Sequence, residues 1–490
     1  MFFFTRNNVT NTIHATHYVR DRLRQGLHTF IHHESFGGIL LFFSVILAMI
    51  IANSSYSNWY FKFLEASFGG FIGQWSFKMN VLHFTNAVLM SLFFLMVGLE
   101  MKREVLYGEL AGFKKINFSL LGALGGMILP ILIYLYFNYN TTSANGFGVA
   151  MSTDTAFALG VLLLFGKRIP PALKIFLVTL AVFDDLGAIL VIAILYTETL
   201  NLFWIYSAGV ITCILIAINY YDIKYTSAYI FLGILLWVAF YNSGVHATIA
   251  GVLLALTIPG RSDIRKKYFI QILDVLEEWS AIADNIKEDC QQSKQPKKNF
   301  FTSFRENIAS IFTHDKEQKI DMQIANKHVQ ILDKLTKYSH YAQNPLVKIE
   351  VFLQPICAYF IVPIFAFLNA GIPLHSDINF NIDGLFMGTL LGLLVGKPLG
   401  VITFAYLGEK LAIATRPAKL NYMHILAIGM IAGIGFTISM FVANLAYATH
   451  EQIMLAKLSI LIASLIATIL GVILLFFITR PKISTSTPNQ

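Results

Sequence analysis

Charged residues are scarce in this chain. Only 13% of its 490 residues are Asp, Glu, Lys or Arg, against about a quarter in a typical soluble domain. Hydrophobic residues make up 56% of the chain, and its mean hydropathy is +0.63. This composition excludes an ordinary soluble enzyme or binding domain. It predicts a polytopic protein whose surroundings are a lipid bilayer.

Cysteine is rare as well. The three cysteines, Cys213, Cys290 and Cys357, lie far apart and have none of the spacings that bind zinc or build a disulfide framework. We therefore expect no cofactor. The first apolar run is only four residues long and precedes the basic residues, so we also expect no cleavable signal peptide.

Basic residues outnumber acidic ones by 36 to 28, which gives a formal net charge of +8. This excess does not indicate nucleic-acid binding, because the basic residues fall in short loops between apolar segments, where the rules of membrane insertion place them. Alternate loops carry most of them, for example Arg103, Lys115 and Lys174. The asymmetry predicts that both termini lie in the cytoplasm.

Hydropathy predicts about twelve transmembrane helices. They fall near residues 36–53, 85–101, 118–137, 146–165, 172–196, 202–219, 228–241, 245–258, 351–370, 385–407, 425–446 and 453–477. The seventh and eighth segments are short for a full crossing, which favours a bundle with tilted or interrupted helices. The expected fold class is an all-α polytopic membrane protein.

The apolar segments also suggest how the chain is organised. We expect an N-terminal cytoplasmic or amphipathic segment at 1–35, spans 1–8 at 36–259, a charged cytoplasmic insertion at 260–348, spans 9–12 at 349–480 and a cytoplasmic tail at 481–490. Residues 15–31 fit an amphipathic helix on the membrane surface or a disordered tail equally well. Within the insertion, residues 264–286 and 321–337 have helical apolar spacing, which we interpret as solvated surface helices rather than a regulatory element.

Two adjacent carboxylates, Asp184 and Asp185, lie near the middle of the fifth apolar segment. An ionisable group at that depth costs roughly 2.5–3.5 kcal/mol on insertion scales, and two side by side repel each other. Such a pair requires a proton, a cation or a basic partner. We therefore expect a site that exchanges protons for metal cations inside the membrane. The structural alternative is a helix turn exposed in a polar crevice.

Two other apolar segments are interrupted. Ser152, Thr153, Asp154 and Thr155 place three hydroxyls and a carboxylate in the fourth segment. This is typical of unwound backbone that lines a cavity, or of a helix N-cap formed by Asp154. The stretch GIGFTIS at 433–439 interrupts the eleventh segment. Paired broken spans indicate a transporter built from inverted repeats, with its site where the two spans cross at mid-membrane.

Lys397 lies about halfway along the tenth segment, among apolar neighbours. Half a span is ~15 Å of helix, which is too far for a lysine side chain to reach the interface. A buried lysine is either neutral or paired with a carboxylate. Asp184 or Asp185 is its natural partner.

With these stretches the chain resembles the NhaA-type sodium/proton antiporter family. The matching stretches include LMSLFFLMVGLEMKRE (89–104), STDTAFALGVL (152–162), VFDDLGAI (182–189), SGVHATIAGV (243–252), LLVGKPLG (393–400) and GIGFTISMF (433–441). The resemblance covers roughly residues 31–259 and 346–480. It leaves out the tail 1–30 and most of 260–348.

The resemblance implies a Na⁺(Li⁺)/H⁺ antiporter of the bacterial inner membrane, electrogenic and pH-regulated, which exports sodium in exchange for protons by alternating access. Na⁺, Li⁺ and H⁺ would be its substrates. Asp185 would be the principal ligand of the transported cation, with Asp184 beside it, and Lys397 would pair with Asp184 when the cation is absent. Thr153 would lie at the site. Asp154 and Lys397 would offset the partial charges of the facing half-helix ends.

The resemblance also implies regulation and assembly. Glu100, Lys102, Arg103, Glu104 and Glu350 match a cytoplasmic pH-sensing cluster, and His246 matches a histidine linked to the pH response. From the residues alone, Glu100 and Lys102 are ordinary interfacial charges and His246 is a hydrogen-bonded core histidine. Family members form homodimers, partly through the loop that corresponds to residues 54–83 here.

One position departs from the family pattern. Ala87 stands just before the second span's Leu-Met pair, where members usually carry an aspartate. A supporting carboxylate on the periplasmic side is therefore missing, and we expect the pH dependence or the cation affinity to differ.

A protease, a channel and a scaffold are the rival functions. An intramembrane aspartyl protease needs its two carboxylates on facing helices, whereas adjacent residues of one helix point about 100° apart. A cation channel has little use for a buried lysine opposite the pair. A scaffold would keep its role in an Asp185→Asn variant. We expect a transporter and not an enzyme.

Overall fold

The computed structural model describes residues 35–72, 75–107, 113–196, 200–221, 223, 225–260, 273–277, 344–374, 383–417 and 420–479. The expected helices at 15–31 and 321–337 and the tail 481–490 lie outside these ranges. Of the expected helix at 264–286 only residues 273–277 are described, and they are helical. The chain divides into two compact units, one made of residues 1–258 and 350–490 and the other of residues 259–349.

Helices dominate the described residues, which confirms the expected helical membrane fold. Nine of these helices are long and apolar enough to cross a membrane, or up to eleven if each of two bent pairs is one span. The bent pairs are Gly37–Ala52 with Ser57–Glu65, at 111°, and Tyr422–Ala432 with Phe436–Ala446, at 48°. Thr248–Thr257 is apolar but has only 10 residues, about 15 Å of helix. The number twelve therefore stays a prediction.

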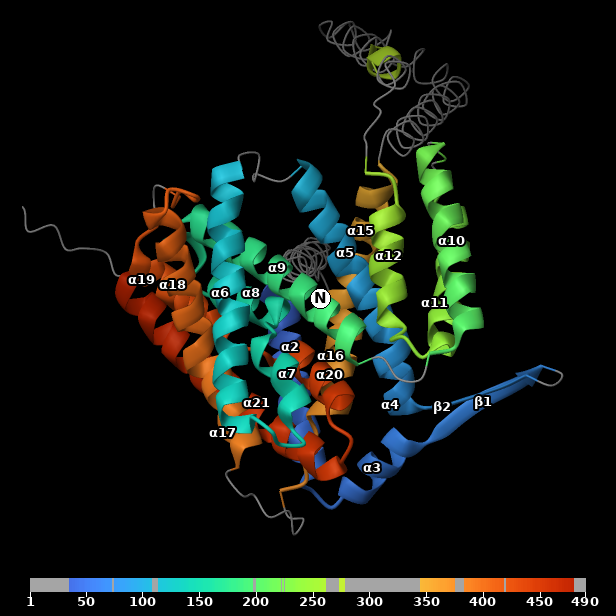
Figure 1. Ribbon diagram of the computed structural model, residues 1–490, viewed down its shortest axis with the longest axis horizontal. Helices are drawn as coiled ribbons and strands as arrows, with labels where there is room; N and C mark the ends of the chain where they lie inside the picture. The colour runs from blue at the N-terminus through green and yellow to red at the C-terminus, as the bar shows by residue number, and fades with distance from the viewer. Residues whose placement is uncertain are drawn as a thin grey trace, which may run out of the picture. The chain divides into compact units, whose positions relative to one another are not determined.

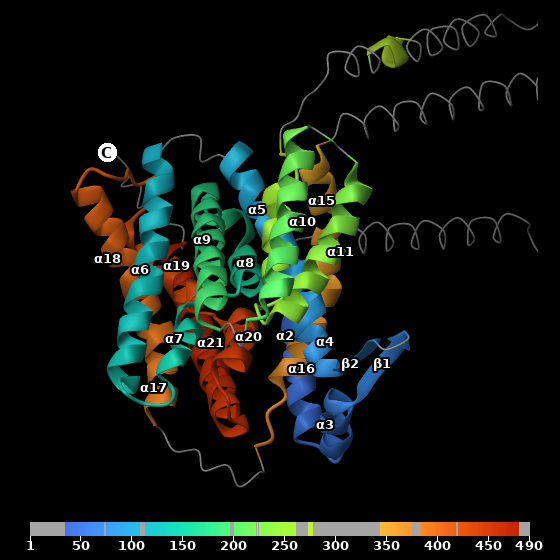
Figure 2. The same ribbon diagram turned by 45° about the vertical axis from the view of Figure 1, so that its right-hand side comes forward.

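The helices of the first unit form two groups (Figures 1 and 2). The crossing group consists of α6 (Phe113–Asn138), α7 (Phe147–Met151), α8 (Thr155–Leu163), α9 (Pro171–Leu195), α17 (Gly384–Leu391), α18 (Lys397–Lys410), α19 (Tyr422–Ala432), α20 (Phe436–Ala446) and α21 (His450–Ile478). The flanking group consists of α2 (Ser35–Ala52), α5 (Met90–Tyr107), α10 (Leu202–Tyr220), α11 (Thr226–Ser243), α12 (Thr248–Thr257), α15 (Pro345–Ile356) and α16 (Val362–Ala370). The main contacts between the groups join α2 to α8, α16 to α20 and α5 to α9.

The outer helices present apolar side chains to the surroundings. On α10, Phe203, Val210 and Ile214 are exposed. Only 11% of the most apolar 18-residue stretch of this helix is buried in protein. An apolar helix that is not covered by protein needs lipid around it, since water would be an unfavourable neighbour. This surface agrees with the membrane location that the composition predicts.

A small antiparallel hairpin is the one addition to the helices in the described residues. It consists of β1 (Ser67–Ile72) and β2 (Trp75–Asn80), with Ser67 opposite Asn80. It lies between α3 (Ser57–Glu65) and α4 (Val81–Phe84), within the loop 54–83. In both views the hairpin extends away from the helices (Figures 1 and 2). The hairpin was not expected from the sequence. β1 (SFGGFI) contains two glycines and does not alternate, and the apolar–polar alternation of β2 (WSFKMN) covers only six residues.

In the part of the chain that the structure describes, three spans contain a π-helical turn: η1 (Thr85–Leu89), η4 (Cys357–Ile361) and η5 (Gly392–Gly396). A π-turn adds one residue and so rotates the side chains that follow. η5 directly precedes Lys397. The helix after it packs closely on α6, because a Cβ atom at Gly125 or at Gly400 would overlap the backbone of the other. Together these features orient Lys397 toward the interior of the crossing group.

Candidate functional site

Two broken spans meet inside the crossing group. The backbone unwinds at residues 152–154 between α7 and α8, and again at 433–435 between α19 and α20. The breaks are hydrogen-bonded to each other: the Asp154 amide donates to the Ile434 carbonyl at 2.7 Å. Thr153 Oγ1 lies 2.9 Å from the carbonyl oxygen of Ala432, the last residue of α19. Short polar side chains and glycines favour such breaks, since they satisfy or free backbone groups that a continuous helix would pair.

The Asp154 carboxylate accepts hydrogen bonds at both breaks. Its Oδ1 accepts from the Phe157 amide at 2.9 Å, which makes it the N-cap of α8. Its Oδ2 accepts from the Thr437 amide at 3.1 Å and from Thr437 Oγ1 at 2.7 Å, at the start of α20. The carboxylate is 1% exposed. A negative group between two helix N-termini offsets their partial positive charges. Asp154 is therefore a helix cap and also a link between the two spans.

Asp184 is paired with Lys397. The two side chains are 0% exposed, and Lys397 Nζ lies 2.7 Å from Asp184 Oδ2. Lys397 also donates to the carbonyl of Met151, the last residue of α7, so its positive charge lies at a helix C-terminus. Thr153 Oγ1 is 2.8 Å from the same Asp184 oxygen. These contacts offset part of the cost of burying the charge pair. Those made to Asp184 all go to Oδ2, and Asp184 Oδ1 has no hydrogen-bond partner.

Asp185 has fewer polar partners than Asp184. It is 2% exposed, and its Oδ2 accepts from Thr155 Oγ1 at 3.2 Å. Its Oδ1 has no hydrogen-bond partner, and among the described residues no lysine or arginine forms an ion pair with it. Consecutive helix residues point about 100° apart, so Asp184 meets α18 while Asp185 meets the start of α8. The site thus has one compensated carboxylate and one that needs a positive charge from elsewhere.

The donor set suits a cation that prefers oxygen. Within the part of the chain that the structure describes, no three His, Cys, Asp or Glu side chains come together as a metal centre. Carboxylate, hydroxyl and backbone carbonyl oxygens surround the crossing instead. Such oxygens, together with unwound backbone, are the ligands that transporters offer to Na⁺. A cation here would be cargo.

The charged residues expected near the second span lie on α5 and at the start of the α15 span. Arg103 Nη1 lies 2.9 Å from Glu350 Oε1, and Glu350 is 3% exposed. Lys102 donates to the carbonyls of Leu256 and Ile258 at the C-terminal end of α12. Glu100 and Glu104 are half-buried on the same helix as Lys102 and Arg103, namely α5.

His246 does not join this cluster. It precedes the N-terminal end of α12, whereas Lys102 contacts the C-terminal end about 15 Å away along the helix. His246 Nδ1 lies 2.9 Å from Thr248 Oγ1, and its ring packs edge-on to Phe441 with the centroids 5.2 Å apart. The structure therefore brings five of the six expected pH-sensing residues to one end of the flanking group and puts His246 at the other end of α12.

Ala87 is buried in η1 and has amide neighbours. The preceding residue, Asn86, accepts through Oδ1 from Asn369 Nδ2 at 3.3 Å. Asn444 Nδ2 in turn donates to Asn369 Oδ1 at 2.7 Å. We call these three side chains the asparagine ladder. It stands next to the position of the missing carboxylate, and its Asn369–Asn444 bond crosses from the flanking group to the crossing group.

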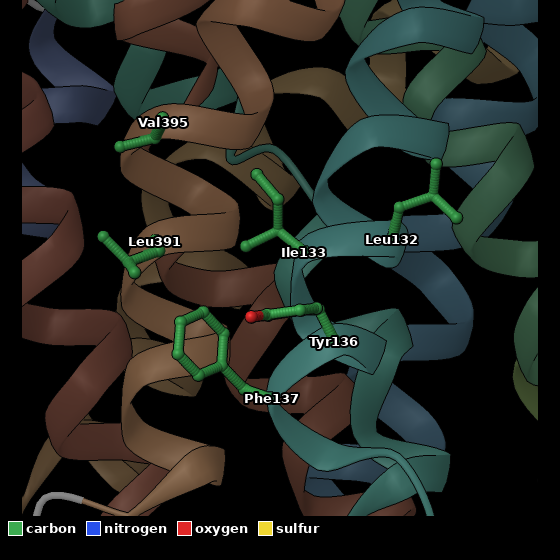
Figure 3. A pocket seen from close by; sticks show the side chains of 6 residues that line it. All are labelled: Leu132, Ile133, Tyr136, Phe137, Leu391 and Val395. Atoms are coloured by element: carbon green, nitrogen blue, oxygen red, sulfur yellow. The ribbon is translucent and has the colours of Figure 1, made fainter.

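An apolar groove elsewhere does not belong to the site. It has a volume of about 360 Å³ and is lined by Leu132, Ile133, Tyr136, Phe137, Leu391 and Val395. These side chains come from α6 and from the α17–η5 span that packs beside it (Figure 3). Apart from the Tyr136 hydroxyl the lining offers no oxygen to a cation.

Two residues with direct contacts were not assigned a role from the sequence. Thr155 contacts Asp185, and Thr437 contacts Asp154. Both stand in the interrupted stretches, and a hydroxyl at a helix break in an apolar span is the signal that marks them. Which carboxylate each one meets depends on how the spans cross.

The chain matches the profile of the family described as Na⁺/H⁺ antiporter 1 over residues 28–475. It belongs to this family. The family consists of antiporters, so the prediction that the chain is not an enzyme is confirmed. The resemblance seen in the sequence motifs is confirmed as well.

Relatives match almost the whole chain. It is 47% identical over 442 residues to the Na(+)/H(+) antiporter NhaA of Wolinella succinogenes, covering 90% of this chain and 91% of that one. It is 45% identical over 469 residues to the Na(+)/H(+) antiporter NhaA 2 of Helicobacter hepaticus, covering 95% and 98%. It is 42% identical over 456 residues to the Na(+)/H(+) antiporter NhaA of Helicobacter pylori strain G27, covering 93% and 96%.

The alignment with one relative extends into the segment 260–348. With 95% of this chain aligned to the H. hepaticus relative, the unaligned remainder is far shorter than the segment 260–348. The alignment with that relative therefore includes most of this segment.

Proposed function

We propose that this protein exchanges Na⁺ or Li⁺ for H⁺ across a membrane, with Asp185 as the group that the two substrates share. One observation carries the assignment: Asp185 is buried without a positive partner, while Lys397 neutralises Asp184 next to it. A carboxylate in that position binds a proton or a small cation, because an isolated charge is costly inside a membrane. Binding of one substrate then displaces the other.

Alternating access makes the exchange vectorial. The crossing group holds Asp154, Asp184, Asp185 and Lys397, and it meets the flanking group through a limited set of helix contacts. Movement of one group against the other would open Asp185 first to one side and then to the other. The proton gradient then drives sodium out of the cell. Transport is electrogenic if more than one proton moves per cation.

The cellular setting follows from the loops and the relatives. The excess of basic residues in alternate loops supports cytoplasmic termini, and the relatives are bacterial. We place the protein in the bacterial inner membrane, with residues 260–348 on the cytoplasmic side. The hairpin β1–β2 extends from the helices and supports a homodimer formed partly through residues 54–83.

Regulation by pH is assigned to the cluster on the cytoplasmic side. The Arg103–Glu350 pair and Lys102 tie α5 to the neighbouring helices α15 and α12. A change in charge at this cluster would alter how these helices pack. His246, with its aromatic contact to α20, is the second site assigned to the pH response.

The rival functions fit the geometry less well. Asp184 pairs with Lys397 and Asp185 meets Thr155, so the two carboxylates do not face each other across a shared water as a protease requires. A channel gains nothing from the buried ion pair at the crossing.

The test is the Asp185→Asn variant in everted membrane vesicles, with proton movement followed by a pH-sensitive dye on addition of Na⁺ or Li⁺. We expect the exchange signal to fall to background. Asp383→Asn is the matched control, because Asp383 caps α17 away from the crossing and asparagine is also a good cap. Exchange at the unmodified rate in Asp185→Asn would remove the assignment.

A further inference from the structure

Thr155 stands where a cation at Asp185 would need another oxygen. It is the first residue of α8, and its hydroxyl lies 3.2 Å from Asp185 Oδ2. Among the described residues it is the only side chain that hydrogen-bonds to Asp185. Two threonine hydroxyls thus reach the pair: Thr153, in the break 152–154, contacts Asp184, and Thr155, at the start of α8, contacts Asp185.

The two hydroxyls are not equivalent. Thr153 Oγ1 lies within hydrogen-bond distance of Asp184 and of the Ala432 carbonyl, and the Asp184 oxygen it meets is already bound by Lys397. Thr153 is completely buried, whereas Thr155 is half-buried. Thr155 therefore lies on the more accessible side of the pair, beside the carboxylate that lacks a countercharge.

A threonine hydroxyl can either donate a hydrogen bond or offer an oxygen lone pair from the same oxygen position. Its single proton points to Asp185 when the carboxylate accepts it, and rotation about the C–O bond turns an oxygen lone pair toward the same space. Asp185 Oδ1 has no partner to give up. A cation beside Asp185 would thus find a carboxylate and a hydroxyl oxygen ready, with no ion pair to break.

We propose that Thr155 Oγ1 is a further ligand of the transported cation and that it sets how the site discriminates between Na⁺ and Li⁺. This inference rests on the proposed role of Asp185. Na⁺ is the larger ion and is coordinated by more oxygens than Li⁺, so it depends more on a neutral ligand beside the carboxylate. Selection by the number of available oxygens is a general device of ion sites.

Three variants test it: Thr155→Val, which keeps the shape and removes the oxygen, Thr155→Ser, which keeps the oxygen, and Thr179→Val as a control. Thr179 is a buried threonine of α9 whose hydroxyl bonds only to the Ile175 carbonyl. Each is assayed as full-length protein in proteoliposomes, with Na⁺ and Li⁺ titrated at one pH, and Na⁺ binding to the purified protein is measured by calorimetry.

For Thr155→Val we expect the KM for Na⁺ to rise about tenfold, as for the loss of one good polar contact, with the maximal rate kept. The KM for Li⁺ should rise less, and the calorimetric affinity for Na⁺ should fall in parallel. Thr155→Ser and Thr179→Val should stay close to the unmodified protein. Gel filtration checks that all three variants are folded.

Unchanged KM values in Thr155→Val would overturn the proposal, as would a Thr155→Ser variant as impaired as Thr155→Val. An equal rise for both cations would overturn the selectivity part. Asp185→Asn is run in parallel to separate the two hypotheses. If it still transports, the proposed function fails. If it is inactive while Thr155→Val behaves normally, only the role of Thr155 fails.

Discussion

Lys397 Nζ lies 2.7 Å from Asp184 Oδ2, with both side chains completely buried. This ion pair joins α18 to α9 and also reaches the end of α7 through the Met151 carbonyl. It leaves Asp185, the next residue, as the carboxylate whose charge no described side chain compensates. The transport proposal is based on this difference in charge compensation between two adjacent aspartates.

The first prediction concerns the stability of this pair. Lys397→Met should lower the free energy of unfolding by about 3–5 kcal/mol, because it leaves Asp184 buried without its partner. The double variant Asp184→Asn/Lys397→Met should regain most of the loss, since it removes both charges. The measurement is the thermal unfolding midpoint of the protein purified in detergent. A double variant as unstable as the single one would show that the charge of Asp184 is not the cause.

The second prediction concerns Arg103 and Glu350. Glu350→Gln and Arg103→Gln change the local charge in opposite directions, so they should shift the pH profile of exchange in opposite directions. We expect each shift to be about 0.7 pH unit, which corresponds to about 1 kcal/mol. The measurement is the dye signal of everted vesicles across a pH series at saturating Na⁺.

The swapped variant Arg103→Glu/Glu350→Arg is the control for this cluster. It keeps the net charge and the opposite signs, and it should return the profile toward the original. Shifts in the same direction for both single variants would contradict an electrostatic role for the pair.

The third prediction uses the asparagine ladder of Asn86, Asn369 and Asn444 to test movement between the helix groups. In a chain whose native cysteines are replaced by serine, a short thiol cross-linker should bridge Asn369→Cys and Asn444→Cys. These positions are neighbours on α16 and α20, in different groups. We expect the cross-link to stop exchange almost completely and reduction to restore it.

The control for this experiment is a cysteine pair within one helix group. Asn86→Cys and Asn369→Cys are also neighbours, but both belong to the flanking group, because η1 with Asn86 continues directly into α5. A cross-link there should leave most of the exchange rate intact. Full exchange in the cross-linked Asn369/Asn444 pair would rule out relative motion of the two groups as the transport step.

Much of the fold was available from the sequence alone. Long apolar segments predicted a membrane bundle, because hydropathy depends only on local composition. The acids at 184 and 185, the break at 152–155, Lys397 and the glycines at 433 and 435 stood out because polar or flexible residues are costly in an apolar span. The π-turns carried no such local signal.

The tertiary structure alone decided which groups meet. From the sequence, either carboxylate could pair with Lys397. Packing of α6 against both α18 and α9 brings Lys397 to Asp184. The sequence could predict Asp154 as the N-cap of its own helix. Only the crossing of two distant spans brings Thr437 to the second oxygen of Asp154. Partners far apart in the chain are chosen by helix packing and by the rotation of each helix about its axis, and neither is encoded in local spacing.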